Sequence, residues 1–548
     1  MTSWLRLLRN RELTMAGLLD ELLPLRANRV VRRDAERGDE PFADLHREVA
    51  AMSGFLREEA GVQPGDRVGI GRTNDPRCFR WFLAAIRAGA IAVPLNPLLR
   101  LPELQRIVSR CGVSTMVTDG PLFRSSIGRR DALPVARWIQ DDAGEMLPGF
   151  VRMGPDWLRR PPAPHAVVSP RDTVAIFHTS GTDGVPKGAR LSSEALLGGR
   201  AMALVTSVLV SHRAVALMAL PWAHIMAISA ALYGLMAGVS GCFLPRFEVA
   251  EVLRTIQRHR VTVVVGVPAM FIRLLNANPP PAALASVRLW VSASDHMPAA
   301  WRHRLVRYGA LVRGPAGLRL RSIFLNAYGM VELGGIGMFG VDAPFLPGGG
   351  ELCLPCPRFR VRVAGADGRP VPRGTQGECL VRGPGVGDAT WDESAGAGRL
   401  VTPDGWLRTG DLAVRNRLGL VRLVGRSKDV IKCGGYTVLP LEVEDALAAH
   451  PAVARAAVVG VPHTDNGEEP VAVVECREGF DPTEEDLLDW CRQRLAVYKR
   501  PRRIGRVPAG TLPTGVTEKV LRNVLRARLA ARDTPAPLTT AAPQVPRP

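Results

Sequence analysis

The sequence predicts an α/β protein with a large N-terminal body and a smaller α+β unit near its C-terminal end. Strand-length apolar runs alternate with amphipathic helix-length stretches, which is typical of mainly parallel sheets covered by helices. After Gly425 the pattern changes to a compact region with its own helices and strands. The chain has 548 residues, too many for one hydrophobic core, so two or more domains are expected.

The elements of the body follow from this alternation. Residues 42–96 contain an amphipathic helix, a strand at 68–70, a helix at 79–88 and a strand at 90–94. This order is typical of βαβ units. Further strands are expected at residues 113–118, 174–177, 214–220, 261–267 and 289–291.

The sequence pattern changes in the C-terminal part of the chain. Residues 359–381 show short alternating strands with turns, which predicts a small antiparallel or barrel-like element. Beyond it we expect helices at 441–448 and 484–495 and strands at 453–461 and 470–476. Residues 533–548 hold five prolines without apolar periodicity and are predicted to be a disordered tail.

Composition excludes several classes of protein. The formal net charge is +19, but the basic residues are scattered along the chain, so no nucleic-acid partner is expected. Nine scattered cysteines argue for a reducing compartment. The first 23 residues are interrupted by charges and lack the apolar core of a signal peptide. A cytoplasmic location is expected, with peripheral membrane contact left open.

One segment is long and apolar enough to suggest a membrane. Residues 214–245 carry no formal charge apart from His224, and their length would span a bilayer. Pro221 and several glycines dilute the segment, and no second such segment accompanies it. We therefore expect a buried helix and strand here and no transmembrane segment, with a membrane-embedded protein as the alternative.

The stretch from Thr179 to Gly188 is predicted to bind a polyphosphate. It leaves the expected strand at 174–177 and precedes a helix start at residues 191–194. Glycines free its backbone, hydroxyls can donate hydrogen bonds, and Lys187 adds a cation. It is not the P-loop consensus. The candidate phosphate ligands are Thr179, Ser180, Gly181, Thr182, Gly184 and Lys187.

Lysine is rare in this chain. Of the 71 lysines and arginines only five are lysines: Lys187, Lys428, Lys432, Lys499 and Lys519. A lysine retained against such a background is expected where a compact charge on a flexible stem is needed.

This loop is similar to the phosphate loop of the adenylate-forming superfamily, which includes acyl-CoA synthetases and the AMP-dependent synthetase and ligase family. Five further stretches resemble that family in its order: residues 221–224, 326–332, 405–411, 425–432, and Lys519 within 512–522. The resemblance covers residues 42–529. It implies an N-terminal domain (1–425) for AMP and the acyl group, a hinge (426–430), a mobile lid domain (431–532) and the tail (533–548).

The resemblance implies an acid–thiol ligase that uses ATP, Mg²⁺ and CoA. A carboxylate would attack the α-phosphorus of ATP to give an acyl-adenylate, and CoA would then take the acyl group. Lys187 and the loop would neutralise the phosphates, Glu332 would hold Mg²⁺, and Lys519 would reach the forming acyl phosphate from the lid.

Other family positions map onto the nucleotide, the hinge and the acceptor. The stretch with Asn326, Tyr328 and Gly329 would bind adenine, with Tyr328 stacking on the base. Asp411 and Arg426 would fix the ribose. Lys428 lies at the hinge position. Gly434 and Gly435 resemble the segment that lines the pantetheine tunnel, and His224 resembles the gate of the acyl pocket.

Three departures from the family pattern bear on turnover. Val331 replaces the threonine usual before the metal glutamate, which removes a hydroxyl. Glu518 replaces the glycine before the catalytic lysine, adding a carboxylate that could pair with Lys519. Residues Ser292 to Met297 replace the usual glycine-rich turn beside adenine.

The substrate is expected to be a hydrophobic acid. No acidic residue stands near His224 to bind a substrate amine, and the neighbouring positions are apolar or small. A medium- or long-chain fatty acid is therefore favoured. One alternative is an acyl-AMP ligase that loads a carrier protein docked on the basic residues between Arg492 and Arg506. Another is a nucleotide-binding homologue with weakened catalysis.

Overall fold

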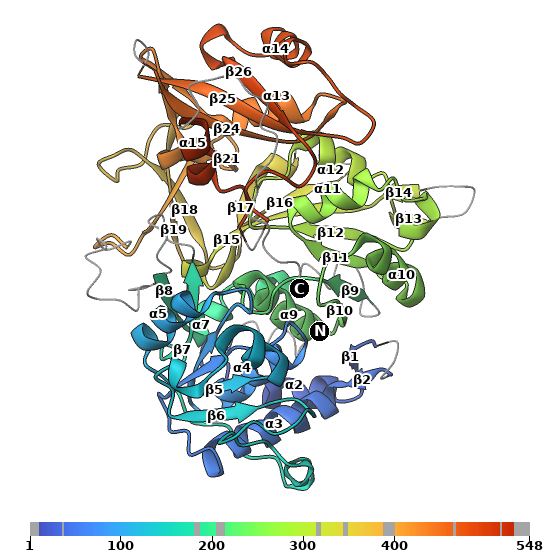
Figure 1. The fold of residues 1–548 in the computed structure, drawn as a ribbon, viewed down its shortest axis with the longest axis vertical. Coiled ribbons are helices and arrows are strands. Elements are labelled where there is room, and N and C mark those ends of the chain that lie inside the picture. Colours follow the sequence, from blue (N-terminus) through green and yellow to red (C-terminus); the bar gives the residue numbers. More distant parts are fainter. Residues whose placement is uncertain are drawn as a thin grey trace.

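The computed structural model describes residues 10–34, 38–179, 187–203, 214–313, 319–343, 349–386, 401–463, 467–515 and 518–530. The described strands form three large sheets and one two-stranded ribbon (Figure 1). The first two share one hydrophobic core, which extends from Leu13 to Val421. The third sheet has separate cores of its own. The fold class is α/β, with a large body and a smaller C-terminal domain, as the sequence predicts.

The N-terminal sheet has the strand order β6-β5-β3-β4-β7-β8. Its strands are β3 (Arg67–Ile70), β4 (Ile91–Pro94), β5 (Val113–Thr118), β6 (Arg137–Gln140), β7 (Thr173–Thr179) and β8 (Lys187–Ser192). The packed helices include α2 (Leu18–Arg26), α3 (Phe42–Glu58), α4 (Arg77–Arg87) and α5 (Leu101–Cys111). All neighbours pair in parallel except β7 and β8.

The antiparallel pair β7 and β8 corrects one expectation. The sequence predicts that the phosphate loop leads directly into a helix, but β8 lies between the loop and the short helix α7 (Ser193–Leu196). Thr179 pairs with Lys187, so the loop closes a hairpin. Ser192 then caps α7 by accepting a hydrogen bond from the Ala195 amide.

The second sheet forms the centre of the body. Its parallel strands are β9 (Val215–Met218), β10 (Ser240–Phe243), β11 (Val263–Gly266), β12 (Leu289–Ser292) and β15 (Ile323–Met330), with β1 (Val30–Arg32) and β2 (Glu40–Pro41) at one edge. The helices beside it are α9 (Ile225–Ala237), α10 (Val249–His259), α11 (Pro268–Asn276) and α12 (Ala299–Leu305). A two-stranded ribbon, β13 (Ala310–Arg313) and β14 (Arg319–Arg321), lies outside it.

The apolar segment 214–245 is folded into this sheet. It forms strand β9, helix α9 and strand β10, one strand more than the helix and strand expected from sequence. Both strands pair in parallel with each other, and α9 is buried on most sides. Over the described residues, none of the helices combines the length and the hydropathy that a bilayer crossing needs.

The antiparallel part of the body continues the second sheet. Strands β16 (Gly335–Asp342) and β17 (Leu352–Pro355) lead into β18 (Arg360–Ala364), β19 (Gln376–Arg382), β20 (Leu407–Arg415) and β21 (Val421–Arg426). Of the two alternatives expected here, an antiparallel or a barrel-like element, the structure has the antiparallel one: β18 to β21 pair in series as a meander, and β21 joins β17.

The lid, which we define as residues 431–530, has its own sheet. Its strands are β22 (Ile431–Cys433), β23 (Tyr436–Val438), β24 (Val453–His463), β25 (Gly467–Cys476) and β26 (Arg503–Val507), and its helices are α13 (Pro440–Ala448), α14 (Glu484–Arg492) and α15 (Arg522–Ala530). The second sheet ends at Arg426 and the lid sheet begins at Ile431. The Pro-rich tail lies outside the described residues.

Side-chain contacts join the lid to the body. Nε2 of His296 lies 2.8 Å from Oδ1 of Asp445 on α13. The guanidinium of Arg477 lies 4.5 Å from the ring centroid of the buried Trp301 on α12. Nη2 of Arg273 donates to Oε1 of Glu518 at 2.5 Å. The lid is therefore held against the body by polar and cation–π contacts in this structure.

Candidate active site

A carboxylate, a guanidinium and a phenol meet where the second sheet ends. Asp411 on β20 faces Arg426 on β21 in the strand register. Its Oδ1 lies 3.0 Å from Nε of Arg426, and its Oδ2 accepts a hydrogen bond of 2.6 Å from the hydroxyl of Tyr328 on β15. Three strands thus hold one carboxylate in a fixed orientation.

The electrostatics of this cluster keep Tyr328 protonated. Burial and the charge of Asp411 raise the pKa of Tyr328 well above its ordinary value. The phenol is therefore a permanent donor to the carboxylate at neutral pH. The Asp411 backbone is fixed too, because its amide donates to Oγ1 of Thr409, which itself donates to the carbonyl of Cys379.

Glu332 lies beside this cluster in a 3₁₀ turn formed by Val331–Leu333. Burial raises its pKa and outweighs the opposing charge of Arg426. A carboxylate in that state gains from a nearby cation. No group of three or more metal-ligating side chains occurs among the described residues. A lone carboxylate still fits Mg²⁺, which keeps several waters and takes its remaining ligands from phosphates.

Lys519 reaches the same place from the lid. Burial lowers the pKa of its amine, and the charges of Asp295, Arg426, Arg522 and Asp411 act on it as well. Lys519 is thus close enough to Asp411 and Arg426, the residues predicted for the ribose, for their charges to act on its pKa. The sequence does not predict the effects of the other two residues: the carboxylate of Asp295 raises the pKa of Lys519, whereas the guanidinium of Arg522 lowers it.

Two residues that stand where the family pattern has glycine have backbone angles typical of glycine. Ser294 has φ 74° and Glu518 has φ 58°, both in the left-handed region that favours glycine. Such residues cost of order 1–3 kcal/mol and persist where the surroundings fix them. The carboxylate of Glu518 hydrogen-bonds to Arg273, in place of the Lys519 partner that the sequence suggests.

The predicted acyl side is built around α9. His224 is the N-cap of this helix, and its Nδ1 accepts from the Met226 amide at 3.3 Å. Burial lowers the pKa of His224 to about 4, so the imidazole is neutral at physiological pH. Trp222 stacks on Phe79 with ring centroids 5.2 Å apart.

Asn74 holds the backbone of this acyl-side loop, a role that sequence reasoning missed. Its Oδ1 accepts from the Trp222 amide at 2.9 Å, and its Nδ2 donates to the carbonyl of Pro245 at 3.0 Å. Asn74 stands in no motif, and only its place in a polar loop after β3 could have marked it. One side chain therefore ties together both ends of the segment that contains α9.

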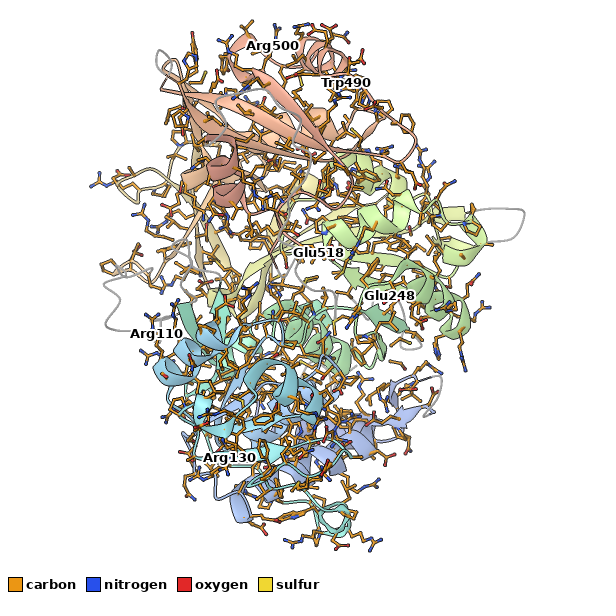
Figure 2. The ribbon with its side chains drawn as sticks, in the orientation of Figure 1. Arg110, Arg130, Glu248, Trp490, Arg500 and Glu518 are labelled. Carbon is orange, nitrogen blue, oxygen red and sulfur yellow. The ribbon has the colours of Figure 1, made fainter. Side chains whose placement is uncertain are left out.

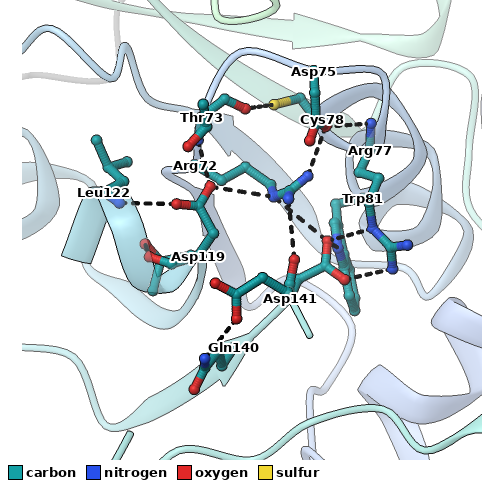
Figure 3. A network of polar contacts seen from close by, with 12 residues as sticks. Arg72, Thr73, Asp75, Arg77, Cys78, Trp81, Asp119, Leu122, Gln140 and Asp141 are labelled. Atoms are coloured by element: carbon teal, nitrogen blue, oxygen red, sulfur yellow. Dashed lines mark hydrogen bonds and ion pairs between the residues drawn. The ribbon is translucent and has the colours of Figure 1, made fainter. Parts of the chain in front are cut away.

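A buried charge network supports the Asn74 loop (Figure 3). Arg72 donates to Asp75 at 2.7 Å and to the backbone carbonyl of Asp141 at 3.0 Å. The Asp141 carboxylate accepts from Arg77 and from the indole of Trp81. Because these charges are paired and mostly buried, the network fixes the loop geometry.

The remaining predicted residues are spread over the site and its surroundings. Nδ2 of Asn326 donates to the carbonyl of Gly350 at 3.2 Å. A Cβ on Gly329 would lie 2.0 Å from the Gly335 carbonyl oxygen, so this position requires glycine. Lys428 is exposed between β21 and β22. Ser180, Gly181, Thr182 and Gly184 lie outside the described residues.

Gly434 and Gly435 form the turn between β22 and β23. Both have left-handed backbones, with φ 54° and 81°, and both are exposed. The turn therefore presents a backbone without side chains to solvent.

Family comparisons cover both parts of the chain. A sequence model of the AMP-binding enzyme family matches residues 27–389, and one of the AMP-binding enzyme C-terminal domain matches residues 442–530.

Known proteins resemble this chain over nearly its whole length. A feruloyl-CoA synthase of an Amycolatopsis species is 33% identical over 491 residues, which cover 89% of this chain and 93% of that protein. An indoleacetate–CoA ligase of Aromatoleum aromaticum is 30% identical over 531 residues, covering 94% and 98%.

Solved structures agree with these matches. The anthranilate CoA ligase AuaEII in complex with anthranoyl-AMP gives a TM-score of 0.81 at 26% identity, covering 95% of this chain and 98% of that one. ATP-bound MatB from Rhodopseudomonas palustris gives 0.78 at 27% identity, covering 95% and 99%.

Proposed function

The chain belongs to the AMP-binding enzyme family, and from this premise we propose that it joins a bulky hydrophobic carboxylic acid to CoA. It is an AMP-forming acid–thiol ligase that works through an acyl-adenylate. The observation that supports the assignment of residues is the cluster of Asp411, Arg426 and Tyr328 in the body, with contacts of 3.0 and 2.6 Å, together with the Arg273–Glu518 pair that joins the body to the residue before Lys519.

In the first half-reaction an oxygen of the substrate carboxylate forms a bond to the α-phosphorus of ATP. The bond between the α-phosphorus and the bridging oxygen breaks, and pyrophosphate leaves. Lys519 stabilises the negative charge that develops on the acyl phosphate, while Asp411 accepts from the ribose hydroxyls. Lys187 acts on the leaving group. Glu332 would hold Mg²⁺, which would neutralise charge on the phosphates.

In the second half-reaction the CoA sulfur bonds to the acyl carbon, the thiol loses its proton, and AMP leaves with the electrons of the broken bond. This step needs a path for pantetheine, for which Gly434 and Gly435 are the proposed lining. Both glycines are exposed in this structure, so their backbone is accessible to a slim ligand.

The proposed acyl pocket is an apolar cavity between α9 and the face of the sheet that α9 covers. It is lined by side chains that include Phe79, Met218, Trp222, Ala230, Phe243 and Val265. The charged residues of its lining are all paired: Glu40 accepts from Arg80 at 2.6 Å and from Arg32 at 2.8 Å, and the arginines have further partners in Glu48 and Asp34. A substrate with a second charge would find no free partner among these residues.

A ring-containing acid fits this cavity better than the fatty acid that the sequence favours. Three of the lining residues are aromatic and provide flat surfaces for a ring. The relatives named above act, by their names, on ferulate, indoleacetate and anthranilate. We therefore place an aromatic or other cyclic hydrophobic acid first and fatty acids second.

CoA is favoured over a carrier protein as acceptor. Several residues of the basic run proposed for carrier docking are neutralised within the lid. Arg492 pairs with Glu485, Lys499 with Glu442 at 2.6 Å, and Arg506 with Asp481 at 2.7 Å. Surface charges that are already paired attract an acidic partner less strongly.

A panel of acids tests the function. Ferulate, indoleacetate, anthranilate, octanoate and palmitate are assayed for ATP–pyrophosphate exchange and for AMP release with and without CoA. We expect exchange with at least one ring acid and AMP release that depends on CoA. Exchange with fatty acids alone would overturn the substrate class. Exchange that survives Lys519→Ala at the wild-type rate would overturn the assigned role of the lysine.

A further inference from the structure

One ion pair joins the body directly to the residue before Lys519. Nη2 of Arg273, in the last turn of α11, donates to Oε1 of Glu518 at 2.5 Å. Figure 2 shows Glu518 between the lid and the body. The two side chains are 48% and 28% exposed, so solvent screens the pair without removing it.

The backbone of Glu518 is hydrogen-bonded as well as its side chain. Its carbonyl accepts a hydrogen bond of 3.0 Å from Arg455, and its amide donates to the Gly515 carbonyl at 2.8 Å. The Gly515 amide donates in turn to the carbonyl of Lys519 at 2.9 Å. The turn that carries Lys519 is thus tied to the lid through its backbone and to the body through the Glu518 carboxylate.

On the body side, Arg273 lies on helix α11, which follows strand β11 in the chain. Strand β11 contributes Val265 to the lining of the proposed acyl pocket. Helix α11 begins at Pro268, directly after the end of β11 and Val267. The guanidinium of Arg273 also lies 5.4 Å from the ring centroid of Phe247, which limits its freedom. The position of the Arg273 guanidinium is therefore restricted by a contact within the body as well as by its pair with the lid.

We propose that Arg273 and Glu518 are positioning residues that hold Lys519 over the site during adenylation. Glycine, usual at the position of Glu518 in the family pattern, has no side chain that could form this contact. The left-handed strain at Glu518 is offset in part by the ion pair. This inference rests on the proposed function, in which Lys519 serves the adenylation step and not the transfer to CoA.

The test separates the two half-reactions. Arg273→Gln and Glu518→Gln are compared with wild type in single-turnover adenylation and in acyl transfer to CoA from chemically prepared acyl-AMP. We expect adenylation to fall about three- to tenfold while transfer stays unchanged or becomes faster. The exchanged pair Arg273→Glu with Glu518→Arg should recover part of the loss. Equal falls in both half-reactions, or none in either, would overturn the proposal.

Arg254→Gln serves as the matched control. Arg254 pairs with Glu251 within the neighbouring helix α10, and no ion pair or hydrogen bond joins it to the described residues of the lid. Its loss removes a comparable surface ion pair, so adenylation should stay at the wild-type rate. A fall equal to that of Arg273→Gln would mean that any surface charge change produces the effect.

A second readout does not depend on activity. The chain has only five lysines, so labelling with an amine-reactive reagent can be followed at each of them by mass spectrometry. Loss of the pair should raise the labelling rate of Lys519 about three- to tenfold, while the exposed Lys432 stays constant. Unchanged labelling would refute the positioning role even if every acid tested proves inactive, whereas wild-type inactivity alone counts only against the proposed function.

Discussion

At the scale of single residues, the site combines groups whose charge states are set by their neighbours. Tyr328 is predicted from sequence to stack on adenine, and its hydroxyl is found to hold Asp411. The charge state of Lys519 depends on its surroundings, because burial lowers the pKa of its amine. Tyr328 gives a prediction for nucleotide binding, and Lys519 gives one for the pH dependence of the adenylation rate.

Tyr328→Phe should weaken ATP binding while leaving the fold intact. The variant keeps the ring but removes a hydrogen bond to a charged carboxylate, which is worth about 1.5–3 kcal/mol. The KM for ATP in pyrophosphate exchange should rise roughly tenfold, with little change in the KM for the acid. Tyr308→Phe, in a hydrophobic cluster away from the site, should change neither constant. An unchanged KM for ATP in Tyr328→Phe would contradict the role.

Adenylation should decline at alkaline pH because Lys519 acts as a cation. Burial lowers the pKa of its amine below the ordinary lysine value of 10.5. The amine is charged below this pKa and loses its proton as pH rises through it, so the rate falls on the alkaline side before pH 10.5. Pyrophosphate exchange measured against pH reports the midpoint. Lys519→Arg should be slower but lack this midpoint, since arginine stays charged.

At the scale of elements, the predicted acyl side depends on hydrogen bonds between a loop of the first sheet and the segment of the second sheet that contains α9. Asn74 satisfies backbone groups on both sides of α9, and the network around Arg72 and Asp141 supports it (Figure 3). The geometry of the loop at Trp222 thus depends partly on a residue of the first sheet.

Asn74→Ala should affect the acid more than the nucleotide. Removing the side-chain amide leaves the backbone amide of the buried Trp222 without this partner, at a cost of about 1–3 kcal/mol in unfolding free energy. The loop at Trp222 loosens, so the KM for the acid should rise several-fold while the KM for ATP stays near wild type. Asn416→Ala, which removes a turn hydrogen bond in the meander, should leave both KM values unchanged. Equal rises in both constants for Asn74→Ala would refute the role.

At the scale of the whole molecule, the body and the lid have separate hydrophobic cores. The main core contains residues from both body sheets, whereas the lid clusters contain only lid residues. Described contacts between the two, such as His296 with Asp445, are largely polar. The two parts should therefore open as separate cooperative units.

Val458→Ala tests this separation. Val458 is fully buried in the lid core, and removing its methyl groups should cost about 1.5–3 kcal/mol. Amide hydrogen exchange should accelerate across β24 and β25 while the amides of β11 and β12 keep wild-type protection. Val264→Ala, buried in the body, should give the reverse pattern. Faster exchange in both parts from either variant would show that they unfold as one.

Local patterns determined much of the fold. The strand at Val113–Thr118 has the bounds expected from its apolar run, and β3, β4 and β12 lie within one or two residues of expectation. The family and the reaction could also be predicted, because motifs along the chain keep their order. Strand β8 was missed because Lys187–Ser192 contains glycine, arginine and polar residues, and its strand character comes from pairing with β7.

The sequence by itself determined the fold class and the family, since both follow from short-range patterns and from motifs that keep their order. Tertiary structure decided which distant side chains meet. Asn74 reaches Trp222, and Arg273 reaches Glu518, which lies 245 positions away. No local pattern encodes these contacts, because they arise only when separate sheets and the lid pack against one another.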